Sequence, residues 1–210
     1  TILMIINHLQ LAKTIITKFD YLMLRFTITL FLLIQQSWAD VVDVEAWQKE
    51  SPANIGDLLD IQNRLQELLP NAKKALVSIE ASDGAGSGVI VSEEGLVLTA
   101  AHVIGQTGKS MMVRLPNGKR ASAITLGGSE ISDAAMLQIT EDGPWPYIPI
   151  AEKGKSQIGD WCFGLGHPGG FDKERGIVVR IGKIISKKDE TMQTDSRLLG
   201  GDSGGPLFDF

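Results

Sequence analysis

The stretch Gly200-Gly201-Asp202-Ser203-Gly204-Gly205-Pro206 places a single serine hydroxyl in a turn rich in glycine. Serine is a good nucleophile only when a base can take its proton and donors can stabilise the negative charge on the attacked carbonyl oxygen. Glycine permits backbone angles that direct several N–H groups into one small space, so we expect an oxyanion hole from the N–H groups of Gly201 and Ser203. An ordinary surface turn is the alternative, because Gly, Asp and Ser favour turns.

Three histidines are candidates for the base: His8, His102 and His167. His8 lies in an N-terminal segment that we expect to be absent from the mature domain, and His167 lies in a Gly-His-Pro-Gly-Gly loop. His102 follows an apolar run at residues 96–101 that is typical of a buried strand ending in a short turn. A carboxylate must also orient the imidazole. Asp133, directly before another apolar segment, is the candidate for that role.

Three segments resemble the active-site motifs of trypsin-like serine proteases, in that family's chain order of His, Asp and Ser: Thr99-Ala100-Ala101-His102-Val103, Asp133-Ala134-Ala135-Met136-Leu137 and Gly201-Asp202-Ser203-Gly204-Gly205-Pro206-Leu207. Segments 84–91 and 164–170 are similar to a hairpin and a loop of the bacterial HtrA/Deg branch. The resemblance extends from about residue 75 to residue 207. It implies an all-β fold of two antiparallel six-stranded barrels, with the catalytic residues His102, Asp133 and Ser203 in the cleft between them.

Two features depart from the HtrA/Deg pattern. Asp202 precedes the serine, where HtrA-like proteins more often carry asparagine. Seven residues follow Ser203, whereas family members continue through further strands, so we expect a fragment with an incomplete second barrel and low stability. Substrate preference is not predicted, because trypsin-like enzymes often line the pocket with the residue six before the serine, here Arg197, whereas HtrA-like enzymes build this region differently.

The first 39 residues have the features of an export signal rather than of a folded domain. Residues 1–22 are apolar and basic and begin with Thr1, and we expect them to be a non-native upstream extension. Residues 23–39 are typical of a signal peptide, with Arg25 at the start, an apolar core at 26–34 and a small-residue cleavage site ending at Ala39. An uncleaved membrane anchor is the alternative. The protein is therefore expected to be exported, to the periplasm or the extracellular space.

Charge and cysteine content argue against several classes of partner. The first 39 residues hold three of the 20 basic and one of the 25 acidic side chains, which leaves 17 basic and 24 acidic side chains. These form no basic stripe, which argues against nucleic acid. The single cysteine, Cys162, lies in an apolar segment, is expected to be buried and cannot form an intrachain disulfide, which is compatible with a bacterial envelope protein. No metal or cofactor motif is present, so polypeptides are the expected partners.

The spacing of apolar residues predicts one helix and two sets of strands. From Ile55, apolar residues three and four positions apart predict a short amphipathic helix that ends at Pro70. This helix packs on its own domain or, in the less favoured alternative, mediates oligomer contacts. Short apolar segments between turn residues then predict strands. The first barrel takes 75–81, 88–92, 95–99, 110–115, 121–126 and 134–140, and the second set takes 160–165, 176–186 and 191–194.

These elements predict an N-terminal segment with the helix at 40–70, a first barrel at 71–143 and a truncated second barrel at 144–210. The predicted function is a serine endopeptidase that cleaves exported or misfolded proteins through an acyl-enzyme. Ser203 attacks the peptide carbonyl, His102 moves the proton and Asp133 orients His102. The alternative is a catalytically idle protease-fold domain that binds polypeptide. The three catalytic side chains favour the enzyme, and the short C-terminal region favours the idle domain.

Overall fold

The computed structural model describes residues 23, 25, 44–81, 84–152, 154–189 and 191–210. The predicted extension at 1–22 and most of the predicted signal peptide at 23–39 lie outside the described residues. The contacts divide the chain into residues 1–44 and 45–210, and the fold below is that of residues 45–210. Within the described part of the chain, no helix has the length and apolar character needed to cross a membrane.

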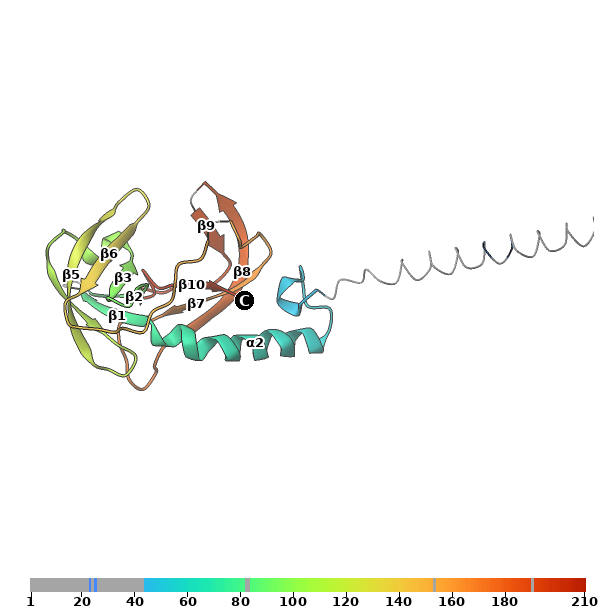
Figure 1. Ribbon diagram of the computed structural model, residues 1–210, viewed down its shortest axis with the longest axis horizontal. Coiled ribbons are helices and arrows are strands. Elements are labelled where there is room, and N and C mark those ends of the chain that lie inside the picture. Colours follow the sequence, from blue (N-terminus) through green and yellow to red (C-terminus); the bar gives the residue numbers. More distant parts are fainter. Residues whose placement is uncertain (1–22, 24, 26–43, 82–83, 153, 190) are drawn as a thin grey trace, which may run out of the picture. The chain divides into compact units, whose positions relative to one another are not determined.

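A closed barrel of six antiparallel strands forms the first half of the fold (Figure 1). Its strands follow one another around the barrel in the order β1-β2-β3-β6-β5-β4, and pairing of β1 with β4 closes it. The strands are β1 (Leu76–Ala81), β2 (Gly84–Ile90), β3 (Leu96–Thr99), β4 (Ser110–Arg114), β5 (Arg120–Ser129) and β6 (Ala134–Ile139). The predicted six-stranded barrel is confirmed.

The barrel closes because each strand directs small and branched apolar side chains inward. Along β5, exposed and buried residues alternate from Arg120 to Thr125, the period of two that a half-buried strand requires. The interior is filled by residues that include Val77, Ile79, Val97, Val113, Leu137 and Ile139. The result is one apolar core that holds the strand ends at the site in place.

Strand β2 begins at Gly84, so the prediction that this strand begins at residue 88 is wrong. Its glycines serve close packing rather than a turn. A Cβ on Gly88 would lie 2.9 Å from Val97 Cγ1, and a Cβ on Gly86 would lie 2.5 Å from Val103 Cγ1. Real Cβ atoms do not approach other atoms this closely, so a larger residue at either position would displace the barrel core.

The second half of the fold is an open sheet of four strands, β7 (Trp161–Gly166), β8 (Val178–Lys188), β9 (Thr191–Thr194) and β10 (Leu207–Asp209). They lie in the order β10-β7-β8-β9, and this sheet does not close on itself. Strand β10 was not among the predicted strands. The chain is therefore mostly β-structure, with one closed barrel and one open sheet, where the sequence predicted a second, incomplete barrel.

Helix α2 (Ile55–Lys74) follows the short 3₁₀ helix η1 (Ala46–Gln48). Asn54 caps it, because its side-chain oxygen accepts a hydrogen bond from the Asp57 N–H at 3.1 Å. The prediction that the helix ends at Pro70 is wrong, since it continues for another turn to Lys74. Proline removes one backbone hydrogen bond within a helix. Here the continued turn buries Ala72 in an apolar cluster with Leu76, Phe163 and Leu165, which compensates for that loss.

Candidate active site

His102 lies on the four-residue helix α3 (Ala101–Ile104), directly after β3, where the sequence predicted a turn. The next two residues, Val103 and Ile104, are buried in the barrel core. Their burial fixes the rotation of the helix and leaves the His102 side chain 57% exposed. Gly105 ends the helix with φ of +67°, a conformation that glycine adopts at little cost. The packing of the barrel thus directs the imidazole out of the core.

Asp133 lies in the turn before β6, and three hydrogen bonds join it to the start of α3. Its Oδ2 lies 2.7 Å from His102 Nδ1, and its Oδ1 accepts a bond from the His102 backbone N–H at 3.0 Å. Its backbone carbonyl accepts a bond from the Ala101 N–H at 3.1 Å. Asp133 has φ of +48°, which is uncommon for a residue other than glycine but tolerated best by Asp and Asn. The backbone conformation directs the carboxylate at the imidazole.

This carboxylate is held in its ionised form. The hydrogen bond from the His102 backbone N–H, together with that from the ring, lowers the pKa of the Asp133 carboxyl group. An ionised acceptor at Nδ1 favours the tautomer in which Nδ1 carries the proton. Nε2 then has a free lone pair and can act as the general base.

Ser203 lies in the segment Leu199–Gly205, which we call the nucleophile turn. Two of its glycines have positive φ, +100° at Gly201 and +81° at Gly204. A Cβ on Gly201 would lie 2.5 Å from the His167 carbonyl oxygen, and one on Gly204 would overlap Thr99 Oγ1. Glycine is therefore required at both positions by conformation and by space, and this turn packs directly against β3 and the loop after β7.

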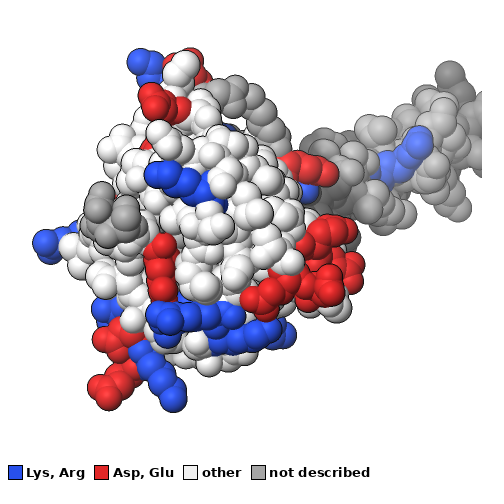
Figure 2. Space-filling model, turned by 90° about the vertical axis from the view of Figure 1, so that its left-hand side faces the viewer, with Lys and Arg blue, Asp and Glu red and all other residues white. Residues whose placement is uncertain are grey.

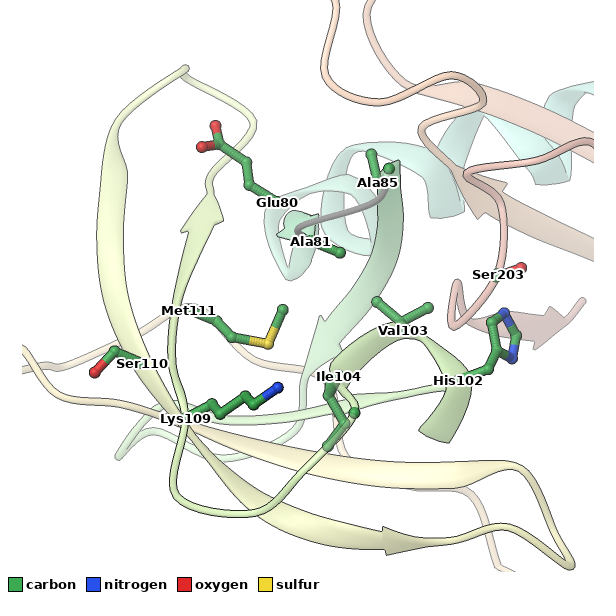
Figure 3. A pocket seen from close by; sticks show the side chains of 12 residues that line it. Glu80, Ala81, Ala85, His102, Val103, Ile104, Lys109, Ser110, Met111 and Ser203 are labelled. Atoms are coloured by element: carbon green, nitrogen blue, oxygen red, sulfur yellow. The ribbon is translucent and has the colours of Figure 1, made fainter.

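His102 and Ser203 line the same pocket, which has a volume of about 500 Å³. Figure 3 shows the imidazole and the Ser203 side chain at one end of this pocket, with Met111, Ala85 and Glu80 toward the other. Ser203 also borders a second hollow of about 210 Å³, whose lining includes Leu198 and Arg180. The nucleophile candidate thus lines two concave surfaces.

Four N–H groups of the nucleophile turn have no acceptor among the described residues, those of Gly200, Gly201, Ser203 and Gly204. Asp202 N–H donates to Leu199 O at 3.0 Å and Gly205 N–H donates to Asp202 O at 2.9 Å. Among the four groups without an acceptor in the described part of the chain, the N–H groups of Gly201 and Ser203 are the pair that the sequence predicts as donors to a carbonyl oxygen.

Ser87 on β2 connects the first barrel to this turn, and sequence reasoning missed it. Its hydroxyl donates to the Gly201 carbonyl at 2.8 Å and accepts a bond from the His167 N–H at 2.9 Å. Its own N–H donates to the Ser203 carbonyl at 2.8 Å. The residue is fully buried. The position of Ser87 between two glycines in the segment 84–91 could have drawn attention to it. Its hydrogen-bond partners, however, are too distant in the sequence to be predicted from this pattern.

His167 and Cys162, the other two reactive side chains considered in the sequence, are both buried. The His167 ring is buried, and neither ring nitrogen has a hydrogen-bond partner among the described residues. Burial and the nearby Arg175 lower the pKa of His167 to about 4, although Asp202 opposes this shift. Cys162 is also buried, as predicted, and burial raises the pKa of its thiol to about 11. His167 is therefore neutral at pH 7, and Cys162 is an unreactive thiol.

Comparison with known proteins agrees with this arrangement. The family described as "Trypsin-like peptidase domain" matches residues 86–210. The Escherichia coli K12 protein named "Periplasmic pH-dependent serine endoprotease DegQ" is 35% identical over 132 residues, which cover 60% of this chain and 29% of that protein. A Pseudomonas fluorescens protein named "Probable periplasmic serine endoprotease DegP-like" is 33% identical over 195 residues, covering 84% of this chain and 40% of that protein.

Among solved structures, the serine endoprotease from Yersinia pestis is similar, with a TM-score of 0.60 and 30% identity. The similarity covers 69% of this chain and 53% of that one. The chain therefore spans roughly a third to a half of the length of these relatives. The family match itself extends over more than half of the 210 residues and includes His102, Asp133 and Ser203. The chain belongs to the family of trypsin-like peptidases, in its HtrA/Deg branch.

Proposed function

We propose that this chain carries the catalytic site of a serine endopeptidase that hydrolyses peptide bonds through an acyl-enzyme. The observation that carries the proposal is the bonded pair of His102 and Asp133, with Ser203 in the same pocket as His102. The pair supplies an oriented base, and the turn supplies a half-buried hydroxyl beside it. These are the parts that nucleophilic catalysis by serine requires.

In this mechanism Ser203 Oγ attacks the carbonyl carbon of the scissile bond while His102 Nε2 accepts the hydroxyl proton. The Asp133 carboxylate stabilises the imidazolium that forms. The N–H groups of Gly201 and Ser203 donate to the oxyanion of the tetrahedral intermediate. His102 then gives its proton to the leaving amine, which departs and leaves the acyl-enzyme. Water next attacks the acyl carbon while His102 takes a proton from it, and His102 returns this proton to Ser203 Oγ as the acid product is released.

The substrates we propose are unfolded or misfolded polypeptides outside the cytoplasm. The relatives are named periplasmic endoproteases, and the sequence at 23–39 has the pattern of a signal peptide. We propose a periplasmic location on these grounds. On the face shown in Figure 2, Lys and Arg side chains lie beside acidic ones, which supports a polypeptide rather than a nucleic acid as the partner. We also propose that the open sheet of β7 to β10 belongs to a second six-stranded barrel.

The experiment that tests the proposed function is turnover of a casein-like substrate by the Ser203→Ala variant. We expect a loss of about 10⁴-fold or more, the scale for removing one member of a catalytic triad. Ser51→Ala removes an exposed hydroxyl before α2 and is the matched control. Turnover by Ser203→Ala at the rate of the control would show that another group performs the cleavage.

One observation favours the alternative, an idle domain that binds polypeptide. Ser203 and His102 share a pocket, but among the described residues no hydrogen bond joins their side chains. Catalytic hydrogen bonds are often long in proteins without substrate and shorten in the complex. Reaction with a fluorophosphonate separates the two functions, because only an activated serine reacts and an idle binder keeps its mass.

A further inference from the structure

The nucleophile turn contains a buried acid, Asp202, whose side chain is only 3% exposed. An ionised carboxylate in such a position must be compensated by charge and by hydrogen bonds. Its Oδ2 accepts three bonds, from Arg180 Nε at 3.2 Å, from Arg180 Nη2 at 3.1 Å and from the Leu199 N–H at 3.0 Å. Arg180 is the only basic side chain that contacts it in the described part of the chain.

The carboxylate closes the turn on itself. Leu199 donates its N–H to Asp202 Oδ2, and Asp202 donates its own N–H back to Leu199 O. Gly200 and Gly201 lie between these two residues. The direction in which the Gly201 N–H points therefore depends on the position of the Asp202 carboxylate.

Arg180 fixes that position from a regular element. It lies on β8, where it pairs with Gly164 of β7 and follows the apolar residues Val178 and Val179. Its side chain is 21% exposed and lines the hollow of about 210 Å³ that Ser203 also borders. A strand is a more rigid support than a turn, so an ion pair from β8 limits how far Asp202 can move.

We propose that Arg180 is a positioning residue for the oxyanion hole: its ion pair with Asp202 holds the nucleophile turn so that the Gly201 and Ser203 N–H groups point at the attacked carbonyl. This inference rests on the proposed function of those two groups. It adds a residue that acts on the site through Asp202. The ion pair compensates the acid beside Ser203 through Oδ2 alone, since Oδ1 is buried without a hydrogen-bond partner among the described residues.

The test compares four full-length proteins: wild type, Arg180→Gln, the double variant Arg180→Gln/Asp202→Asn, and Arg120→Gln. Arg120 is the matched control, because it bonds Glu80 at 3.1 Å in the same way but is 56% exposed on the first barrel. The measured quantities are the rate constant for fluorophosphonate labelling, kcat and KM, and the thermal unfolding transition.

We expect Arg180→Gln to slow labelling and to lower kcat by about 100-fold with little change in KM, because small displacements of catalytic groups have effects of this size. The double variant removes the uncompensated buried charge and should recover at least about tenfold of the loss. Arg180→Gln labelling at the rate of Arg120→Gln would overturn the inference. So would a double variant that recovers nothing, because Arg180 would then not act through Asp202.

Two further measurements apply if Arg180→Gln does not fold or if the wild-type protein is not labelled. Arg180→Lys keeps the charge but loses the guanidinium fork, and it replaces Arg180→Gln if that variant does not fold; we expect an intermediate labelling rate. If wild type is not labelled, the proposed function fails, and amide exchange at Leu199 and Asp202 decides the role of Arg180 alone. Faster amide exchange in the Arg180 variant than in Arg120→Gln would show that the ion pair holds the nucleophile turn. Equal exchange rates would refute this role of Arg180.

Discussion

His102 and Asp133 belong to a closed barrel with a filled interior, whereas Ser203 belongs to a turn beside an open sheet. The first pair is positioned by apolar packing of α3 and by hydrogen bonds between the two residues themselves. The turn is positioned by polar contacts with residues outside it, Ser87 on β2 and Arg180 on β8.

This difference indicates how each half of the site responds to change. Apolar packing is spread over many contacts, so truncating one distant apolar side chain of the barrel should displace His102 little. A turn held by a few buried hydrogen bonds depends on each of them, because an unpaired buried group costs more than the bond itself contributes. The half that carries Ser203 is therefore expected to be the more vulnerable to the loss of a single polar side chain outside the site.

The largest loss of activity is expected from a substitution in the His102–Asp133 pair. Asp133→Asn removes the charge that stabilises the imidazolium and favours the wrong tautomer of His102, so we expect kcat to fall by about 10⁴-fold with the fold intact. Glu130→Gln neutralises an exposed acid in the same turn and is the control. Steady-state kinetics and circular dichroism of both variants check this. Retention of activity within tenfold in Asp133→Asn would remove Asp133 from the mechanism.

A smaller effect is expected from the contact that joins the two halves. Ser87→Ala leaves the Gly201 carbonyl and the His167 N–H without their partner, each costing about 1–3 kcal/mol. We expect kcat to fall by about 100-fold through displacement of the nucleophile turn. Ser78→Ala is the matched control, since Ser78 is an equally buried barrel serine whose hydroxyl has no partner among the described residues. Urea unfolding and kcat of the two variants should differ, and equal values would show that Ser87 does not hold the turn.

The pH dependence of stability sharpens the comparison further. The pKa of His167 is about 4 in the folded protein and about 6.5 in the unfolded chain, so the unfolded chain binds more protons between these values. The free energy of unfolding should therefore fall as the pH is lowered from 6.5 toward 4, by up to about 1.4 kcal/mol per pH unit from this group. His167→Gln should show a shallower slope in denaturant unfolding at several pH values. Identical slopes in the two proteins would contradict the burial of a neutral imidazole beside the nucleophile turn.

The smallest effect is expected at Cys162 on β7. Its thiol is buried and its pKa is raised to about 11, so little thiolate is present at pH 8. We expect no alkylation by iodoacetamide in the native protein and full alkylation after unfolding in guanidinium, measured by intact mass. Rapid alkylation of the native protein would show that the open sheet exposes its interior face.

Sequence patterns predicted the barrel and the candidate catalytic residues because both depend on short segments. The alternation of polar and apolar residues along β5 and the apolar run before His102 are local patterns. They can be recognised without knowing which strands pair with these segments. Local rules were wrong where long-range packing decides the outcome. The strand at β2 was predicted to begin only at residue 88, but it begins at Gly84, and its glycines leave room for Val97 and Val103. Pro70 indicates a helix end, but burial of Ala72 extends α2.

The supports of the nucleophile turn could not be predicted for the same reason. The hydroxyl of Ser87 reaches a carbonyl 114 residues away, and Arg180 reaches an acid 22 residues away. A basic residue within the apolar segment of β8 and an acid beside the serine were visible separately. Only the folded structure shows that Arg180 and Asp202 meet.

The central claim is that Ser203 is a nucleophile activated by His102 across the two halves of the fold. The most direct test is peptide mapping by mass spectrometry after reaction with a fluorophosphonate, in wild type, Ser203→Ala and His102→Ala. The account predicts one adduct per wild-type chain, located on Ser203, no adduct in Ser203→Ala and a much slower reaction in His102→Ala. An adduct on another residue, or labelling of Ser203 at the wild-type rate in His102→Ala, would contradict it.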